Sequence, residues 1–137
     1  MDRKDFIQQT ANAARRAYDF SISSRKQGLM EIEDKIDADA LKCGDIFELG
    51  IRFTLDGENI EKVDEILTNM ISREKDENTR RFKTIQKEAV RCIQGRFNSF
   101  TLLNILFSFI SDDEKNVARE LLADNVFKEY FDSYCEV

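Results

Sequence analysis

The 137-residue chain contains no histidine, no proline and no tryptophan. Histidine is the commonest general base, the usual activator of a nucleophilic serine or cysteine, and a favoured metal ligand. Its absence removes most catalytic arrangements, so we predict a protein that is not an enzyme and that carries no metal or cofactor. The five glycines are scattered singly, which excludes a glycine-rich loop for binding phosphate groups.

Cysteine is scarce as well, with Cys43, Cys92 and Cys135 far apart in the sequence. Without a CxxC pair, this spacing indicates neither a zinc site nor a disulfide framework, and it is typical of a reducing cytoplasm. No signal peptide opens the chain, and its most apolar stretch, residues 100–110, is about half as long as a bilayer-spanning helix. We expect a soluble cytoplasmic protein without a membrane span.

The formal net charge is −6, and a chain with this acidic balance lacks the concentrated positive surface that a nucleic-acid backbone requires. We therefore expect no nucleic-acid partner. Two acidic pairs, Asp37 with Asp39 and Asp56 with Glu58, superficially resemble parts of a calcium loop, but neither has Gly and Glu at the required offsets. We interpret these carboxylates as solvated loop residues.

The residues that are abundant favour helix. Hydrophobic residues make up 42% of the chain and charged residues 35%, with many Glu, Lys, Arg, Leu and Ile. A chain of this length buries enough surface to form one domain without metal or disulfide support. We predict a single domain over residues 1–137, with a compact all-α fold of about five to seven helices.

Apolar residues recur at spacings of three and four along most of the chain, which is the period of an α-helix with one buried face. The pattern predicts a first helix over residues 2–26, a short second helix over residues 29–36 and a largely buried helix over residues 40–55. A strand over residues 51–55 is the alternative for part of the third. A turn at Asp56 and Gly57 follows, and Asn59 is positioned to cap the next helix.

Residues 72–81 are unusual because they include no apolar side chain. Ile71 before them and Phe82 after them are eleven positions apart, close to three whole helical turns, so the apolar faces on the two sides stay in phase. We therefore predict one long helix over residues 60–94, a rod of ~50 Å. A hinge within residues 72–81 is the alternative, although the segment has neither Gly nor Pro to form one.

Gly95 ends that helix, and a short apolar helix over residues 100–110 follows. Residues 111–114, Ser-Asp-Asp-Glu, form a capping-box signature for a last helix. Its apolar positions are Val117, Leu121, Leu122, Val126, Phe127, Tyr130, Phe131 and Tyr134. The chain has eleven phenylalanines, and at helical spacing we assign them to the core rather than to a partner groove.

Three segments carry a resemblance to a known family. They are Ala13-Ala-Arg-Arg-Ala17 with Ser24-Arg25-x-x-Gly28-Leu29-x-x-Ile32-Glu33, then Gly50-Ile-Arg-Phe-Thr-Leu-Asp-Gly57 with the helix that follows it, and then Glu88-Ala-Val-Arg-Cys-Ile-Gln94 with Asn98 and residues 102–110. Their order and spacing resemble the cytoplasmic domain of the flagellar-motor stator family MotA, within the MotA/TolQ/ExbB-type proton channels. In that family the third and fourth membrane helices separate the last two segments, whereas residues 72–81 join them here.

The resemblance implies a role in protein interaction. Stator proteins meet the rotor protein FliG partly through charged residues of this domain, and the matching positions here are Arg25 and Glu33, with Lys26 at the position of a basic residue in some relatives. It implies docking to FliG or another motor component at the cytoplasmic face of the flagellar motor, in motility and chemotaxis. It also implies weak or no self-association, because the family's rings around MotB form largely through membrane segments.

The residues themselves leave alternatives open. Arg25 lies one turn from an apolar stripe, so its stem can pack along that face, and Glu33 can be ordinary solvated surface. On that interpretation the chain is a generic helical adaptor or structural protein with no motor role.

Overall fold

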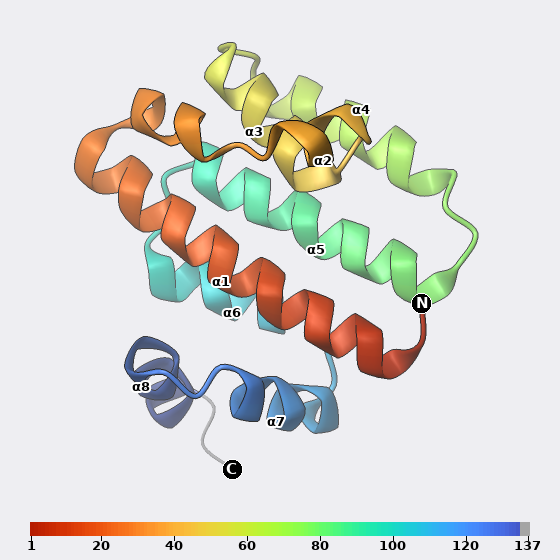
Figure 1. Cartoon of the computed structure of the whole chain (residues 1–137), viewed down its shortest axis with the longest axis vertical. Coiled ribbons are helices and arrows are strands. Elements are labelled where there is room, and N and C mark those ends of the chain that lie inside the picture. The colour runs from red at the N-terminus through yellow and green to blue at the C-terminus, as the bar shows by residue number, and fades with distance from the viewer. Residues whose placement is uncertain (135–137) are drawn as a thin grey trace.

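The computed structural model describes residues 1–134, and all regular structure within that range is helical, which confirms the predicted all-α fold (Figure 1). The described residues form eight α-helices and one 3-10 helix, more than expected because three predicted helices are each split in two. These elements are α1 (Arg3–Gln27), η1 (Leu29–Lys35), α2 (Ala38–Lys42), α3 (Ile46–Leu55), α4 (Ile60–Ser72), α5 (Glu77–Gln94), α6 (Ser99–Phe107), α7 (Asp112–Leu121) and α8 (Asn125–Tyr134). Cys135 lies outside the described residues.

Helix α1 crosses the fold between α5 and α7 and packs most extensively on α5 (Figure 1). Asp2 begins it by accepting a hydrogen bond from a first-turn backbone N–H at 2.7 Å, which satisfies a donor that the helix itself cannot. The buried face carries Ala11, Ala14 and Ala17, whose small side chains let the backbones of α1 and α5 approach closely. The predicted helix over residues 2–26 is confirmed.

Helix α3 meets α5 at a contact that glycine alone permits. A Cβ atom on Gly50 would lie 2.5 Å from Cγ2 of Val90, well inside the contact distance of two non-bonded carbons. Residues 51–55 belong to α3, so the strand alternative for them is wrong. The helix is buried on most of its sides, as its dense apolar pattern predicted.

The predicted continuous helix over residues 60–94 is wrong. The chain turns at residues 73–76, and α4 folds back along α5 as a hairpin (Figure 1). The apolar faces that are in phase on the two sides of the turn meet across this hairpin, where Val63, Leu67 and Val90 are buried. A straight rod would leave much of that surface in water, so hydrophobic burial favours the hairpin.

Polar side chains form the turn between α4 and α5, which explains why it needs neither Gly nor Pro. Asp76 caps α5 by accepting a hydrogen bond from the backbone N–H of Thr79 at 2.9 Å. Arg80 donates to the carbonyl oxygen of Glu74 at 2.7 Å. These bonds satisfy backbone groups that the ends of the two helices leave without partners.

Two other predicted helices are each divided in two, for different reasons. Gly44, with a φ of 78°, divides the helix predicted over residues 40–55 into α2 and α3, because this left-handed conformation favours glycine. The last predicted helix breaks at residues 122–124, and the bend leaves Phe127 and Phe131 of α8 buried in the core. The short second helix is present as the 3-10 helix η1.

Several turn and cap predictions are confirmed. Asn59 accepts a hydrogen bond from the N–H of Lys62 at 2.8 Å and caps α4. Gly57 has a φ of 82°, as the predicted turn before that helix requires. Ser111 and Glu114 form both bonds of the capping box at the start of α7.

The phenylalanines form much of the core, as predicted. Of the eleven, ten are buried or half-buried, and Phe109, at 39% exposure, is the exception. Phe20 and Phe47 meet edge to face at 5.1 Å between ring centroids, while Phe107 and Phe131 lie 5.3 Å apart. These arrangements are the favoured ones for aromatic pairs and join α1 to α3 and α6 to α8.

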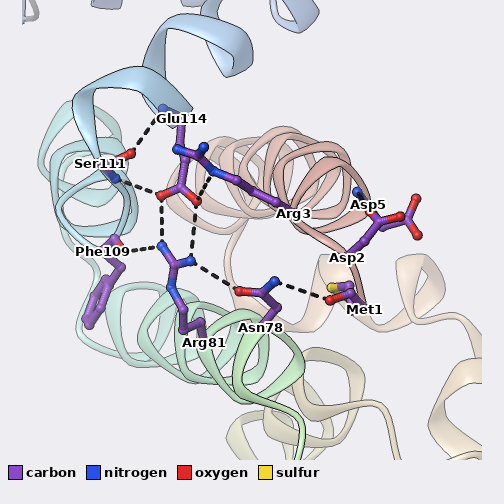
Figure 2. Close-up of polar contacts among 9 residues, drawn as sticks. All are labelled: Met1, Asp2, Arg3, Asp5, Asn78, Arg81, Phe109, Ser111 and Glu114. Atoms are coloured by element: carbon purple, nitrogen blue, oxygen red, sulfur yellow. Dashed lines mark hydrogen bonds and ion pairs between the residues drawn. The ribbon is translucent and has the colours of Figure 1, made fainter.

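A buried carboxylate joins α1, α5 and α7 (Figure 2). The side chain of Glu114 on α7 is only 4% exposed. It pairs with Arg81 of α5 at 2.8 Å and with Arg3 of α1 at 3.4 Å, and it accepts the backbone N–H of Ser111 at 2.9 Å. The charge is therefore compensated from both neighbouring helices and from the start of its own helix.

Arg81 is itself fixed on several sides (Figure 2). Its guanidinium carbon lies 4.1 Å from the ring centroid of Phe6, a cation–π contact with a buried ring of α1. It also donates to the carbonyl oxygen of Phe109 and to the side-chain oxygen of Asn78, each at 3.3 Å. We call this cluster the Arg81–Glu114 junction. Both side chains of the ion pair have further partners, and these hold the pair in one arrangement.

The junction sets the acid stability of the fold. The hydrogen bond from Arg81, aided by the Ser111 N–H, lowers the pKa of Glu114 to about 2, although burial acts in the opposite direction. A carboxyl with a lowered folded pKa stabilises the fold above its unfolded pKa of 4.5, and this contribution is lost as the pH falls toward 2.

We predict that Glu114→Gln lowers the free energy of unfolding at pH 7 by about 2–3 kcal/mol, because the half-buried Arg81 loses its charged partner. The variant also loses less stability than the wild type between pH 4.5 and pH 2. Urea melts across that range measure both effects. Glu120→Gln, an exposed change on the same helix, is the control and shifts stability by less than about 0.5 kcal/mol. Equal acid sensitivity of the wild type and Glu114→Gln would contradict the assignment.

Candidate functional site

The predicted basic residues lie at the C-terminal end of α1. Arg25 and Lys26 are in its last turn, and both side chains are exposed. Within residues 1–134, neither forms a hydrogen bond or an ion pair, so their charges are available to a partner. A cation here also complements the partial negative charge at a helix C-terminus.

A third cation, Arg96, lies in the turn after α5 and reaches the same end of α1. It donates to the carbonyl oxygen of Ser24 at 3.1 Å, next to Arg25 in sequence. Its φ of 59° makes it the one residue other than glycine with a positive φ in the described chain. That conformation ends α5, because the backbone N–H groups of Arg96 and Phe97 turn back to the carbonyl oxygens of Ile93 and Cys92.

Glu33 lies on η1, which follows α1 after the turn at Gly28. Its side chain is 47% exposed and lies 3.4 Å from Arg52 of α3. Arg52 also pairs with Asp56 at 2.8 Å, in an i,i+4 arrangement within one helix end. Glu33 is thus oriented by a neighbour but stays open to solvent.

The structure does not pair the predicted residues with one another. Among the described residues, no hydrogen bond or ion pair joins Glu33 to Arg25 or Lys26. Between them in the chain lies Met30, whose side chain is 69% exposed and the most exposed of the large hydrophobic residues there. We call Arg25, Lys26, Met30 and Glu33 the α1–η1 surface. It presents separate positive and negative groups beside an apolar side chain.

A buried ion pair holds the segment that carries this surface. Glu48 of α3, whose side chain is 4% exposed, pairs with Arg16 of α1 at 2.5 Å and accepts the backbone N–H of Asp37 at 3.1 Å. Arg16 also donates to the carbonyl oxygen of Lys35 at 2.9 Å. The two side chains therefore bind both ends of the connection from η1 to α2. We call η1 and α2, residues 29–42, the strap.

Few buried apolar side chains help the Arg16–Glu48 pair to hold the strap. Within the strap only Ile32 is fully buried, and α2 has no buried residue. Arg16 packs over the ring of Phe20 at 4.9 Å, which keeps its guanidinium directed at Glu48. The half-buried Leu29 and Ile36 also pack against the core, and Glu33 and Lys35 contact Arg52 and Ser23 from the exposed side. The strap is thus held by one fully buried apolar side chain, two half-buried ones and the buried Arg16–Glu48 pair.

Glu48 is less completely compensated than Glu114. Burial raises the pKa of Glu48, and the Arg16 guanidinium and the Asp37 N–H offset this only in part. For Glu48 burial is the largest effect on the pKa, whereas for Glu114 the hydrogen bond from Arg81 is larger than the effect of burial, so the two pKa values shift in opposite directions.

A polar hollow of about 280 Å³ lies beside this ion pair, between α1, α2, α3 and α5. Gln9, Asn12, Asp37, Asp45 and Gln86 supply its polar lining. Gln86 donates to Asp45 at 3.2 Å, so part of that lining is already paired within the protein. The hollow has hydrogen-bonding groups of both kinds but no nucleophile next to a base, since histidine is absent.

Sequence reasoning missed Arg52, Arg96 and the Arg16–Glu48 pair. Arg52 and Asp56 had a readable signal, because opposite charges four apart near a helix end attract. Arg96 and Glu48 had none, since their partners lie 72 and 32 positions away. Such pairs depend on how the helices fold back on one another.

None of the helices formed by residues 1–134 has both the length and the apolar character needed to cross a bilayer. In the same residues, no three acidic or cysteine side chains gather so as to hold a metal ion.

Comparison of the chain with protein-family models, with curated proteins and with solved structures finds no match in any of the three. Any functional assignment therefore rests on the geometry above and on the sequence motifs.

We predict that Glu48→Gln changes the pH dependence of stability in the opposite sense to Glu114→Gln. Because folding raises the pKa of Glu48, the wild type loses stability from this group as the pH rises from 4.5 through the raised value. The variant lacks that loss, so its stability relative to the wild type improves with rising pH. Urea melts at pH 4.5, 6 and 7.5 measure the difference, and Glu31→Gln on exposed η1 is the control. A relative stability that worsens with rising pH would refute the interpretation.

Proposed function

We propose that this chain is a non-catalytic protein-interaction domain that docks to its partner through the α1–η1 surface. The proposal rests on the exposure of the charged side chains there and on which of them already have partners. Arg25 and Lys26 are exposed and have no ion-pair partner within the described chain, while Glu33 is exposed and oriented by Arg52. Charges held on helices favour a defined orientation of the partner.

The exposed charges of such a surface mainly determine which partner binds and how fast it is encountered. Exposed charges are solvated and screened, so they contribute little to stability and modestly to affinity. They steer a partner of complementary charge and reject one of like charge. Met30, which lies between Lys26 and Glu33 in the chain, adds an exposed apolar side chain whose burial by a partner would supply affinity.

The rotor protein FliG, or another component of the flagellar motor, is the partner that we propose. The support is the MotA-like order of motifs in the sequence, in which Arg25, Lys26 and Glu33 occupy the charged positions. The domain would then modulate contact between stator and rotor, without carrying an ion path itself.

The second candidate is a generic helical adaptor that binds through apolar surface. It is favoured by Val117 and Leu121 on α7, which are 44% and 41% exposed and lie on a different helix from the α1–η1 surface. Binding through such side chains is insensitive to charge reversal at Arg25 and Glu33 and depends weakly on salt.

We predict that FliG from the same organism binds the wild type in a titration at low salt, and that binding weakens as salt rises. The double variant Arg25→Glu/Glu33→Lys, which keeps the net charge, should bind at least about tenfold more weakly, because both charges then oppose their partners. Its free energy of unfolding should change by less than about 1 kcal/mol, since both side chains are exposed.

The matched control is Lys75→Glu/Glu65→Lys, an exposed pair on the α4–α5 hairpin with the same charge change, which should bind as the wild type does. Binding that survives Arg25→Glu/Glu33→Lys but is lost in Val117→Ser would support the adaptor. No binding of FliG at either salt concentration would refute the rotor partner.

A further inference from the structure

An apolar groove of about 530 Å³ lies along the outer side of α1 and α7. Its floor is formed by Ile7 of α1 and by Val117 and Leu121 of α7. The two α7 residues are one helical turn apart and are 44% and 41% exposed, whereas Ala118 and Leu122 on the adjacent face are buried. Helix α7 therefore has a second apolar stripe that the fold leaves uncovered.

The two walls of the groove run in the same direction. Arg3 contacts Glu114 near the start of both helices, and Arg15 pairs with Asp124 further along. Helices α1 and α7 are thus parallel, and positions at the start of one lie level with positions at the start of the other (Figure 1).

Opposite charges face one another across the mouth of this groove. Lys4 lies on the α1 wall and Asp113 on the α7 wall, both at the end where the helices begin. Neither side chain forms an ion pair within residues 1–134, and both are exposed. Arg3 adds positive charge to the α1 wall and Asp5 a negative one, so this wall stays net positive.

This arrangement is complementary to itself. A two-fold axis along the groove places the α1 wall of one copy over the α7 wall of the other while both helices keep their direction. Lys4 then faces Asp113 of the second copy, and Ile7 lies over Val117 of the second copy. Both contacts occur twice, as an isologous interface requires.

We propose that the α1–α7 groove is the contact face of a weak symmetric dimer of this chain. A two-fold axis running across the groove would instead set the α1 wall against the α1 wall of the second copy and bring Lys4 toward Lys4, so the charges favour the axis along the groove. The proposal does not depend on the α1–η1 surface or on its partner.

The size of the groove limits the strength of this dimer. From Asp113 to Leu121 the wall is only about 12 Å long. Stable dimers bury about 800 Å² on each partner, which is more than a groove of this length provides. We therefore expect a dissociation constant of roughly 0.1–1 mM, within the weak self-association that the resemblance implies.

Sedimentation equilibrium of the full chain from 10 µM to 2 mM, at a fixed ionic strength of about 0.15 M, tests the proposal. The wild type should pass from monomer toward dimer. Leu121→Ser should weaken dimerisation at least about fivefold, because it removes apolar surface from the floor. The matched control is Val126→Ser on α8, an equally exposed apolar residue outside the groove, which should leave dimerisation unchanged.

A charge exchange tests the direction of the axis. Lys4→Asp and Asp113→Lys should each weaken the dimer, because each brings like charges together, and the double variant should restore it. A chain that stays monomeric to 2 mM, a larger assembly, or a dimer that is indifferent to Leu121→Ser would overturn the proposal. Failure of the double variant to restore what the single changes remove would overturn the two-fold arrangement.

Discussion

The fold depends on the ion pair between Arg81 and Glu114 more than on any other polar contact. A carboxylate with 4% of its side chain exposed is stable only where its charge is matched, and the match comes from a different helix. That requirement fixes α7 against α5, and the contact with Arg3 fixes both against α1. The parallel course of α1 and α7, and with it the groove between them, follows from this junction.

The second buried carboxylate, Glu48, governs a different part of the molecule. It has one arginine partner and holds the strap, which is short in buried apolar residues. We call α1, α5 and α7 the scaffold. The buried carboxylate that joins the scaffold helices is well compensated by neighbouring charges, whereas the one that holds the strap is less well compensated. Met30 and Glu33 lie on the strap, which has fewer buried side chains than the helices α1, α5 and α7. Half of the α1–η1 surface is therefore on the less firmly held segment.

The sequence predicted local features well, since their causes lie within a few residues. The caps at Asn59 and Ser111, the turn at Gly57 and the extent of α1 all have short-range signals, and the core positions follow from helical periodicity. The order of exposed charges at Arg25, Lys26 and Glu33 was also readable.

The reversal at residues 73–76 was not the preferred prediction, since a hinge within residues 72–81 was only the alternative to a continuous helix. A single apolar period over residues 60–94 is equally compatible with a rod and with a hairpin, and only the burial gained by folding back distinguishes them. The Asp76 cap was readable, yet the periodic faces on each side of it concealed the break. The pairs of Arg16 with Glu48 and of Arg96 with the Ser24 carbonyl arise from tertiary placement, so these polar contacts had no signal in the sequence, although the short helix over residues 29–36 did.

Native-state amide hydrogen exchange of the wild type at increasing denaturant tests most directly whether the Arg81–Glu114 junction makes the scaffold one unit. The account predicts that the slowest amides of α1, α5 and α7 open with the same free energy, while those of residues 29–42 exchange with a lower one. Amides of α7 that opened well before those of α1 and α5, or a strap as protected as the scaffold, would contradict it.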